Sequence, residues 1–124
     1  MAPTRSDQNR GQEPAAGDGD DAIKIANLEI RPDECEVLIE GRRAGLTVRE
    51  FEIVHVLAQR CDRVVTRPEI YGRIWGGQMA YRDRSVDVLV RKARRKLAET
   101  APGWSYIHTH FGVGYRFSPE RVAR

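Results

Sequence analysis

The spacing of apolar residues changes several times along the chain. Between residues 23 and 46, short apolar runs alternate with polar residues and are separated by Pro and Gly, which is typical of short strands joined by tight turns. The segments 23–30, 35–40 and 43–46 are therefore expected to be strands of an antiparallel meander, and a break near Ala26 is compatible with the first.

From residue 46 the apolar period becomes that of a helix. Thr47 is expected to cap this helix, and Glu50, three residues later, can close a capping box. Leu46 and Phe51 flank the cap in the positions of a hydrophobic staple, which predicts a first helix that ends near Arg60.

The same capping pattern returns 19 residues later in Val65-Thr-Arg-Pro-Glu-Ile70. Thr66 is the expected cap, Glu69 can close a second capping box, and Pro68 stands in the first turn, where its missing N–H costs nothing. A short second helix is predicted to end near Ile74, followed by a loop over residues 76–82.

The third helix is predicted over residues 84–98, with Asp83 before it as a cap. At roughly 100° per residue, its apolar positions form one narrow stripe, and several basic positions lie almost opposite. Residues 84–99 carry six basic and two acidic side chains, a net charge of +4. The apolar stripe comprises Val86, Val90, Ala93 and Leu97, and the opposite face comprises Arg84, Val88, Arg91, Lys92 and Arg95.

A hairpin is expected after Thr100-Ala-Pro-Gly103, which stops the third helix. Its strands are predicted at 106–109 and 115–117, and the glycines of residues 110–114 supply the turn. Three strands, three helices and a hairpin in this order fit a helix-turn-helix variant with a wing.

Composition and charge refine this picture. The 124 residues suit one domain, expected over 23–118, with a disordered tail over 1–22 and a short tail over 119–124. The tail of 22 residues has a net charge of −3, from two basic and five acidic residues, and residues 23–124 have a net charge of +6, from 19 basic and 13 acidic residues. A basic domain favours a polyanionic partner but is also compatible with an ordinary surface.

Six segments in this order resemble the winged-helix effector domain of OmpR/PhoB-type response regulators. No segment is specific alone, whereas their combined order and spacing are, and the resemblance spans about residues 23–118, essentially the whole expected domain. The six segments are residues 46–51, 64–69, 74–76, 83–87, 91–97 and 112–117.

The resemblance implies an α+β fold, a winged helix-turn-helix with an N-terminal antiparallel four-stranded sheet, three helices and a C-terminal β-hairpin wing. It implies that the recognition helix 84–98 enters the major groove of double-stranded DNA and that the wing, residues 108–116, lies near the minor groove. Two further partners are implied: RNA polymerase, through loop 76–82, and a second copy of the chain in a tandem homodimer on DNA.

Three departures from the family pattern stand out. Only 22 residues precede the domain, where the family carries a receiver domain, so phosphorelay control within this chain is not expected. The chain could be a stand-alone relative of the family or a piece of a longer protein, and Met1 favours the stand-alone relative. Phe111 stands where the wing often carries an Arg. Leu89 replaces a polar residue of the DNA side, and Ala93 a larger core residue, so no target sequence can be transferred.

The candidate DNA contacts follow from the third helix. An Arg can bridge guanine O6 and N7, a Lys is more often found on phosphate, and Val88 could meet a thymine methyl. Arg84 could contact phosphate or pair with Asp87, Arg94 could contact phosphate or only solvent, and Thr66 could hold a phosphate or be a purely structural cap. The full candidate set is Arg84, Ser85, Val88, Arg91, Lys92 and Arg95, with Thr66 and Arg67 of the second helix and Thr109, His110 and Phe111 of the wing.

Other chemistry is not expected. His108 and His110 have no further metal ligands at a suitable spacing, and no nucleophile motif, phosphate loop or carboxylate pair is present, so we expect no metal, no cofactor and no enzyme. Trp75, Tyr115 and Phe117 are expected in the core. With two cysteines and no run of about 20 apolar residues, the protein is expected in the cytoplasm at the nucleoid, without a membrane partner.

Two functions remain open at this point. The first is a sequence-specific, double-stranded DNA-binding transcription regulator. The second is a winged-helix module that binds another protein and has little affinity for DNA.

Overall fold

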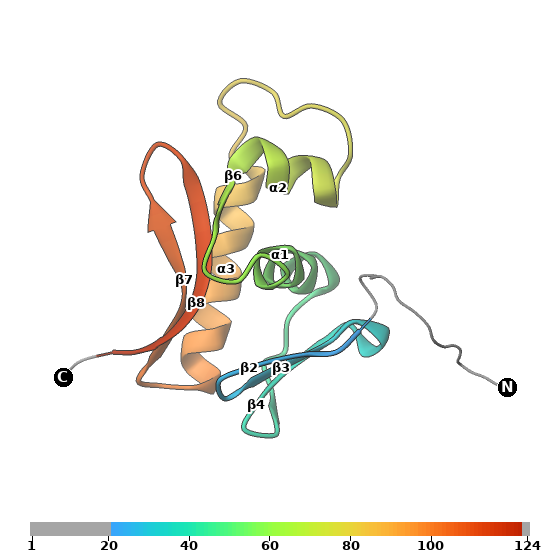
Figure 1. The fold of residues 1–124 in the computed structure, drawn as a ribbon. Coiled ribbons are helices and arrows are strands. Elements are labelled where there is room, and N and C mark those ends of the chain that lie inside the picture. The colour runs from blue at the N-terminus through green and yellow to red at the C-terminus, as the bar shows by residue number, and fades with distance from the viewer. Residues whose placement is uncertain (1–20, 123–124) are drawn as a thin grey trace, which may run out of the picture.

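The computed structural model describes residues 21–122, so the predicted tail over 1–22 lies almost entirely outside the described residues. The N-terminal sheet is antiparallel and has the strand order β2-β3-β4-β5 (Figure 1). Its strands are β2 (Ile23–Ile25), β3 (Leu28–Arg31), β4 (Glu36–Ile39) and β5 (Arg42–Arg43).

The four strands confirm the fold class implied by the resemblance. The break that the sequence allowed near Ala26 is present, and segment 23–30 forms the two strands β2 and β3, because Ala26 has a φ of 54° and turns the chain into a hairpin. The strand expected over 43–46 is only the pair Arg42–Arg43. The turn after β3 is a short 3-10 helix, Pro32–Glu34.

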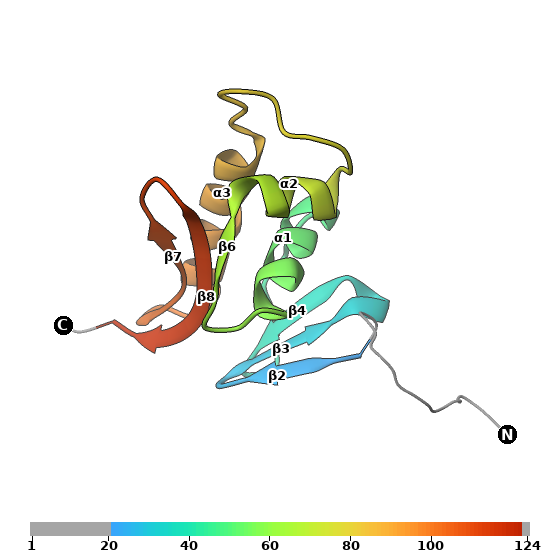
Figure 2. The same cartoon turned by 45° about the horizontal axis from the view of Figure 1, so that its top comes forward.

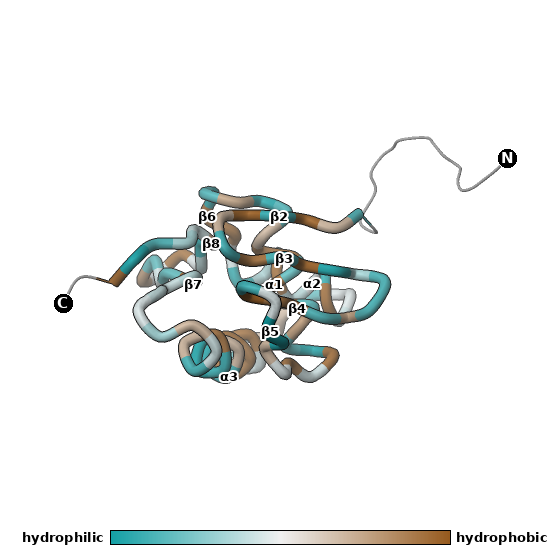
Figure 3. The backbone as a smooth tube through the Cα atoms, turned by 90° about the horizontal axis from the view of Figure 1, so that it is seen from below, coloured by the Kyte–Doolittle hydropathy of each residue, from teal (hydrophilic) through white to brown (hydrophobic). Residues whose placement is uncertain are grey.

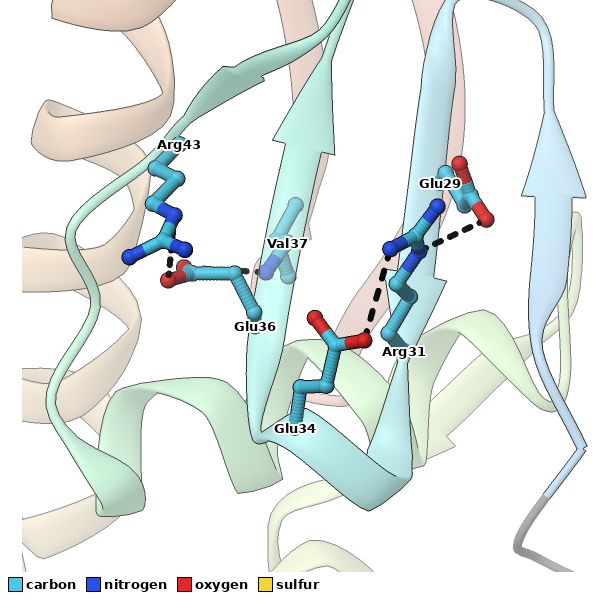
Figure 4. A network of polar contacts seen from close by, with 6 residues as sticks. All are labelled: Glu29, Arg31, Glu34, Glu36, Val37 and Arg43. Atoms are coloured by element: carbon cyan, nitrogen blue, oxygen red, sulfur yellow. Dashed lines mark hydrogen bonds and ion pairs between the residues drawn. The ribbon is translucent and has the colours of Figure 1, made fainter.

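Alternation along β3 and β4 gives this sheet one buried face. Leu28, Ile30, Val37 and Ile39 are at most 2% exposed, and the residues between them point outward. Figure 3 shows hydrophobic and hydrophilic residues following one another along these strands. The outer face carries ion pairs (Figure 4), in which Arg31 bridges two carboxylates and Arg43 approaches Glu36 at 3.8 Å. Exposed pairs of this kind add little stability.

Helix α1 (Val48–Ala58) begins as predicted. The Thr47 side chain accepts a hydrogen bond from the Glu50 N–H, and the Glu50 carboxylate accepts one from the Thr47 N–H at 2.9 Å, which completes the capping box. Helix α2 (Arg67–Ile74) is capped by Thr66 alone. The second capping box is therefore only half formed, because the Glu69 carboxylate pairs with Arg60 at 2.9 Å.

Helix α3 (Ser85–Thr100) starts one residue later and ends two residues later than predicted. The prediction of Asp83 as the cap is wrong, because the N-cap residue is Arg84 and its side chain makes no capping hydrogen bond. Asp83 lies one residue earlier, and its carboxylate accepts a hydrogen bond from the Ser85 N–H at 2.8 Å. The predicted apolar stripe is confirmed, because its four residues are at most 1% exposed. They are Val86, Val90, Ala93 and Leu97.

A second sheet holds the wing. Strands β7 (Trp104–His110) and β8 (Gly114–Arg121) form the expected hairpin, and β8 also pairs with β6 (Val64–Thr66), which the sequence did not indicate. The wing thus belongs to a three-stranded sheet. Strand β8 also continues three residues past the predicted domain end at 118.

The two sheets enclose the helices from different sides. Helix α1 lies between the N-terminal sheet and α2, and α3 runs beside the β7–β8 hairpin (Figures 1 and 2). Buried residues of both sheets and all three helices form one core, which includes Tyr115 and Phe117 as expected. The core fixes α3 by its apolar stripe and leaves its opposite face in solvent.

Candidate nucleic-acid interface

The outer face of α3 gathers most of the predicted contact residues. Arg84, Arg91, Lys92 and Arg95 are all exposed, while Ser85 and Val88 are half-buried on the same side. Within the described residues, Arg95 is the one member of these four cations with an ion pair, a loose contact of 4.0 Å to the exposed Glu99. The face therefore presents positive charge that the fold does not use.

Two other basic residues of α3 are used internally. Arg94 Nη1 donates to the Ile107 carbonyl at 3.0 Å and to Thr109 Oγ1 at 3.1 Å, so it ties the helix to the wing. Lys96 Nζ donates to Glu50 Oε1 at 2.8 Å. The six cations counted in the sequence thus divide into four that face solvent and two that hold the helix in place.

The Glu50 carboxylate is buried, with 3% of the residue exposed. Burial favours its neutral form, but hydrogen bonds from Lys96 and from the Thr47 N–H outweigh that effect and hold the pKa of Glu50 below its ordinary value. One acidic side chain therefore both caps α1 and anchors α3.

Asp87 lies at the centre of a second network, on the flank of α3 that faces the wing. The Tyr115 hydroxyl donates to Asp87 Oδ1 at 2.6 Å and Arg67 Nε donates to the same oxygen at 2.8 Å. The Arg67 guanidinium also lies over the Tyr115 ring, 4.9 Å from its centroid. One carboxylate therefore connects α2, α3 and β8.

Burial and hydrogen bonds set the protonation states in this network. Burial raises the pKa of Asp87, but the hydrogen bonds from Tyr115 and Arg67 and the neighbouring positive charge lower it by more. The pKa of Tyr115 is raised mainly by burial and, to a smaller extent, by its hydrogen bond to Asp87. The network is therefore an ionised pair of Asp87 and Arg67 with a neutral tyrosine.

Three predicted contact residues, Arg84, Arg67 and Thr66, lie in this network or near it in the sequence. Asp87 pairs with Arg67 and Tyr115, and the described residues contain no direct ion pair between Asp87 and Arg84. The Arg84 side chain is exposed to solvent. Arg67 is half-buried and its charge is already paired. Thr66 is occupied as the cap of α2, with its hydroxyl oxygen 3.3 Å from the Glu69 nitrogen.

The predicted wing residues differ in what they offer. Thr109 accepts the hydrogen bond from Arg94, and His110 Nε2 accepts one from Arg116 Nε at 3.1 Å. Phe111 is 90% exposed at the tip. Of the three, only Phe111 has no role inside the domain as the structure describes it.

The backbone of the loop over 76–82 extends beyond α2 (Figure 1), and within the loop Met79 is partly buried against the core. Tyr81 is 88% exposed, and the Arg82 guanidinium lies 5.3 Å from the centre of its ring. Trp75, at the end of α2, is half-buried, packs against the core and contacts the Tyr71 ring in a tilted arrangement with ring centroids 4.9 Å apart, which fits its predicted packing role. Leu89, expected on the DNA side, instead packs against the core.

Sequence reasoning missed the residues that position the interface. The sequence suggested phosphate or solvent for Arg94 and a pair with Arg84 for Asp87, and it gave Lys96 no role beyond its charge. Each of the three instead connects α3 to another element. The available signal was their place on the wheel, between the apolar stripe and the outer face, where a long polar side chain can reach a neighbouring element.

Neither a metal site nor a membrane-spanning helix is found among residues 21–122. These residues contain no cluster of His, Cys, Asp and Glu that could hold a metal ion. None of the helices in this part of the chain is long and apolar enough to cross a membrane.

The chain is similar to known proteins over most of its length. Residues 41–117 match the family model described as "Transcriptional regulatory protein, C terminal". The phosphate regulon transcriptional regulatory protein PhoB of Pseudomonas aeruginosa is 30% identical over 102 residues, which cover 82% of this chain and 44% of PhoB. The chain therefore spans less than half the length of this relative.

Two solved structures have the same fold. The DNA-binding domain of CpxR from E. coli has a TM-score of 0.71 and 26% identity, over 79% of this chain and 96% of that domain. The DNA-binding domain of RstA from Klebsiella pneumoniae, solved in complex with the RstA box, has a TM-score of 0.70 and 28% identity, over 78% of this chain and 96% of that one.

Proposed function

This chain belongs to the family of C-terminal domains of transcriptional regulatory proteins of the OmpR/PhoB type, and from that premise we propose that it binds double-stranded DNA sequence-specifically. Membership of this family of regulatory domains also agrees with the expectation that the chain is not an enzyme. In the proposed complex, α3 lies in the major groove and the wing, residues 108–116, lies near the minor groove. The protein would act where the DNA is, in the cytoplasm.

The observation that carries the proposal is the composition of the outer face of α3. Four cations stand there with one carboxylate, Glu99, and the opposite stripe of the helix is fixed in the core. A helix held in this way can enter a major groove as a rigid body, because its contact side chains are not needed for folding.

The side chains suggest a division of roles. Arg91 and Arg95 have the fork geometry that suits guanine O6 and N7, and Lys92 suits phosphate. Val88, half-buried on the same face, is placed for contact with a thymine methyl. Arg67, by contrast, acts as a positioning residue through Asp87 rather than as a direct contact.

Selection from a random duplex library, followed by titration of the selected site, tests this function. Binding should weaken with salt by about 0.9 in log K per log salt for each phosphate neutralised. Arg91→Ala and Arg95→Ala should each weaken binding to the selected site by about 1–3 kcal/mol if they contact bases, and Lys92→Ala should weaken binding to all duplexes alike.

Arg43→Ala is the matched control. It also removes one exposed cation, but from the N-terminal sheet, where Arg43 makes only a contact of 3.8 Å to Glu36. Its affinity for the selected site should stay near that of the wild type. Absence of salt-dependent binding to any duplex would refute the proposal and favour the protein-interaction module.

We infer two further partners for the same domain. Exposed Tyr81 in loop 76–82 offers an aromatic contact for RNA polymerase, so Tyr81→Ala should reduce transcription in a reconstituted assay without changing DNA affinity. A second copy of the chain should bind the neighbouring half-site in tandem, which a selected direct repeat and cooperative binding to it would support.

A further inference from the structure

The tip of the wing is apolar, although it projects into water. Phe111 is 90% exposed and Val113 is 51% exposed, with Gly112 between them. Neither side chain belongs to the core or packs against it. Single exposed apolar residues are common, but an aromatic and a β-branched residue together on a three-residue turn form a small surface suited to binding.

The hairpin presents this tip rigidly. His110 pairs with Gly114 across the two strands, and the Val113 N–H donates to the His110 carbonyl at 2.9 Å, which closes the turn. Below the tip, Gly114 lies so close to β6 that a Cβ atom on it would be 2.0 Å from the Val65 carbonyl oxygen. The backbone of such a turn loses little freedom when the tip binds.

The wing lies along one flank of α3. Asp87 and Arg94 hold it there through Tyr115 and Thr109. On a helical wheel that starts at Arg84, these two helix positions lie at about 300° and 280°, and Arg91 lies at about 340°, between them along the helix and one step toward solvent. An anionic partner that meets Arg91 therefore has the wing beside it.

The base of the tip is also positively charged. Arg116 of β8 donates to His110 at the end of β7, so a guanidinium lies beside the turn, with only a loose contact of 3.9 Å to the Glu120 carboxylate among the described residues. An apolar tip above a cationic base matches a partner with an anionic surface and an apolar interior. Duplex DNA has this chemistry, with phosphates outside and stacked bases inside.

We propose that Phe111 is an apolar wedge, which enters the minor groove, inserts partly between two base pairs and bends the duplex. The proposal rests on the proposed function, DNA binding. Insertion is easiest at pyrimidine–purine steps, which unstack readily, so this wing would select DNA by deformability where an Arg would select it by groove potential. Phe111 thereby becomes a specificity-determining residue.

The test uses the full chain and the site obtained by selection. Single 2-aminopurine bases are placed in turn at each step of the flanking minor groove, and their fluorescence reports unstacking on binding. Gel mobility of circularly permuted fragments reports bending. The variants are Phe111→Ala, Phe111→Leu and, as a control, Val122→Ala, which removes a 50% exposed side chain just beyond the far end of β8.

In the wild type, fluorescence should rise at one flanking step per bound domain, with a measurable bend. Phe111→Ala should abolish both signals and weaken binding about tenfold, because the burial of one aromatic side chain is lost. Phe111→Leu should retain part of both signals, since Leu is also a known wedge residue. Val122→Ala should behave as the wild type.

Several outcomes would overturn the wedge while the proposed function stands. In the first, Phe111→Ala keeps the wild-type fluorescence and bend. In the second, it weakens binding but the wild type shows no unstacked step, which would place Phe111 on sugars. In the third, it loses only cooperativity between two sites, which would place the tip against a second copy. If the wild type binds no duplex at all, the proposed function itself fails.

Discussion

Replacing Asp87 with Asn tests whether the network between α2, α3 and β8 holds the recognition helix in place. The variant keeps the shape of the side chain but removes its charge. Its one remaining oxygen can still accept a hydrogen bond from Tyr115, while Arg67 loses the charged partner of its 2.8 Å ion pair. We expect a lower free energy of unfolding and weaker DNA binding by the folded protein.

The contacts set the size of this effect. Breaking a fully buried ion pair by removing one partner costs about 3–5 kcal/mol, and an exposed pair contributes about 0–1 kcal/mol. The Arg67 and Asp87 side chains are 23% and 28% exposed, nearer the buried limit. We therefore expect a loss of about 2–3 kcal/mol at pH 7, which for a domain of this size lowers Tm by roughly 10–20 °C.

The pH dependence gives an independent check. The pKa of Asp87 is lower in the folded protein than in the unfolded chain, so its contribution is fully present above the unfolded pKa of about 4. It is lost as pH falls through the lower pKa of the folded state. The gap in stability between the wild type and Asp87→Asn should therefore be largest near neutral pH and close in acid.

Urea unfolding from pH 7 down to the lowest pH at which the wild type stays folded measures both quantities. Glu52→Gln is the control, because its 2.9 Å pair with Arg49 is much more exposed, and it should cost under about 0.5 kcal/mol. An Asp87→Asn variant as stable as this control at pH 7, or a gap that does not narrow on acidification, would refute the reasoning.

Two further predictions concern other supports of the interface. Lys96→Met leaves the buried Glu50 carboxylate without its cation, so the free energy of unfolding should fall by about 3 kcal/mol at pH 7. Burial is then opposed only by the hydrogen bonds from Thr47, so the pKa of Glu50 should be higher than in the wild type, and the loss, followed by urea unfolding, should shrink as pH falls. Gly114→Ala forces a Cβ atom against the Val65 carbonyl oxygen and should lower the free energy of unfolding by more than about 3 kcal/mol, as measured by thermal unfolding. Gly112 has a φ of 79° and open space around it, so Gly112→Ala should lower the free energy of unfolding by only about 1–2 kcal/mol. Equal losses at the two glycines would contradict the close approach at β6.

Local chemistry made the helices predictable. Thr47 and Glu50 satisfy each other's backbone groups within four residues, so the start of α1 needs no information from elsewhere in the chain. The apolar stripe of α3 was equally clear, because its period of 3.6 residues leaves one face for the core. The same helical wheel predicts the candidate face on α3, because the positions opposite the buried stripe remain exposed.

Pairing between distant segments was not predictable in this way. Strand β6 is only three residues long and is strand only because β8, some 50 residues later, hydrogen-bonds to it. Glu69 illustrates the same limit, since its sequence position fits a capping box but the Arg60 guanidinium lies within reach and takes the carboxylate. Charged side chains have several possible partners, and only the tertiary fold selects one.

That selection also decides how the interface works. The helix and the wing, which would enter different grooves, are joined by Arg94 to Thr109 and by Asp87 to Tyr115, while β6 holds the wing from its other side. Because these contacts lie beside the outer face of α3 and not on it, binding to DNA need not break them. The distance between the two groove-facing surfaces is then set by the protein, so a duplex that does not match it must bend, and the choice among sequences includes how easily each one bends.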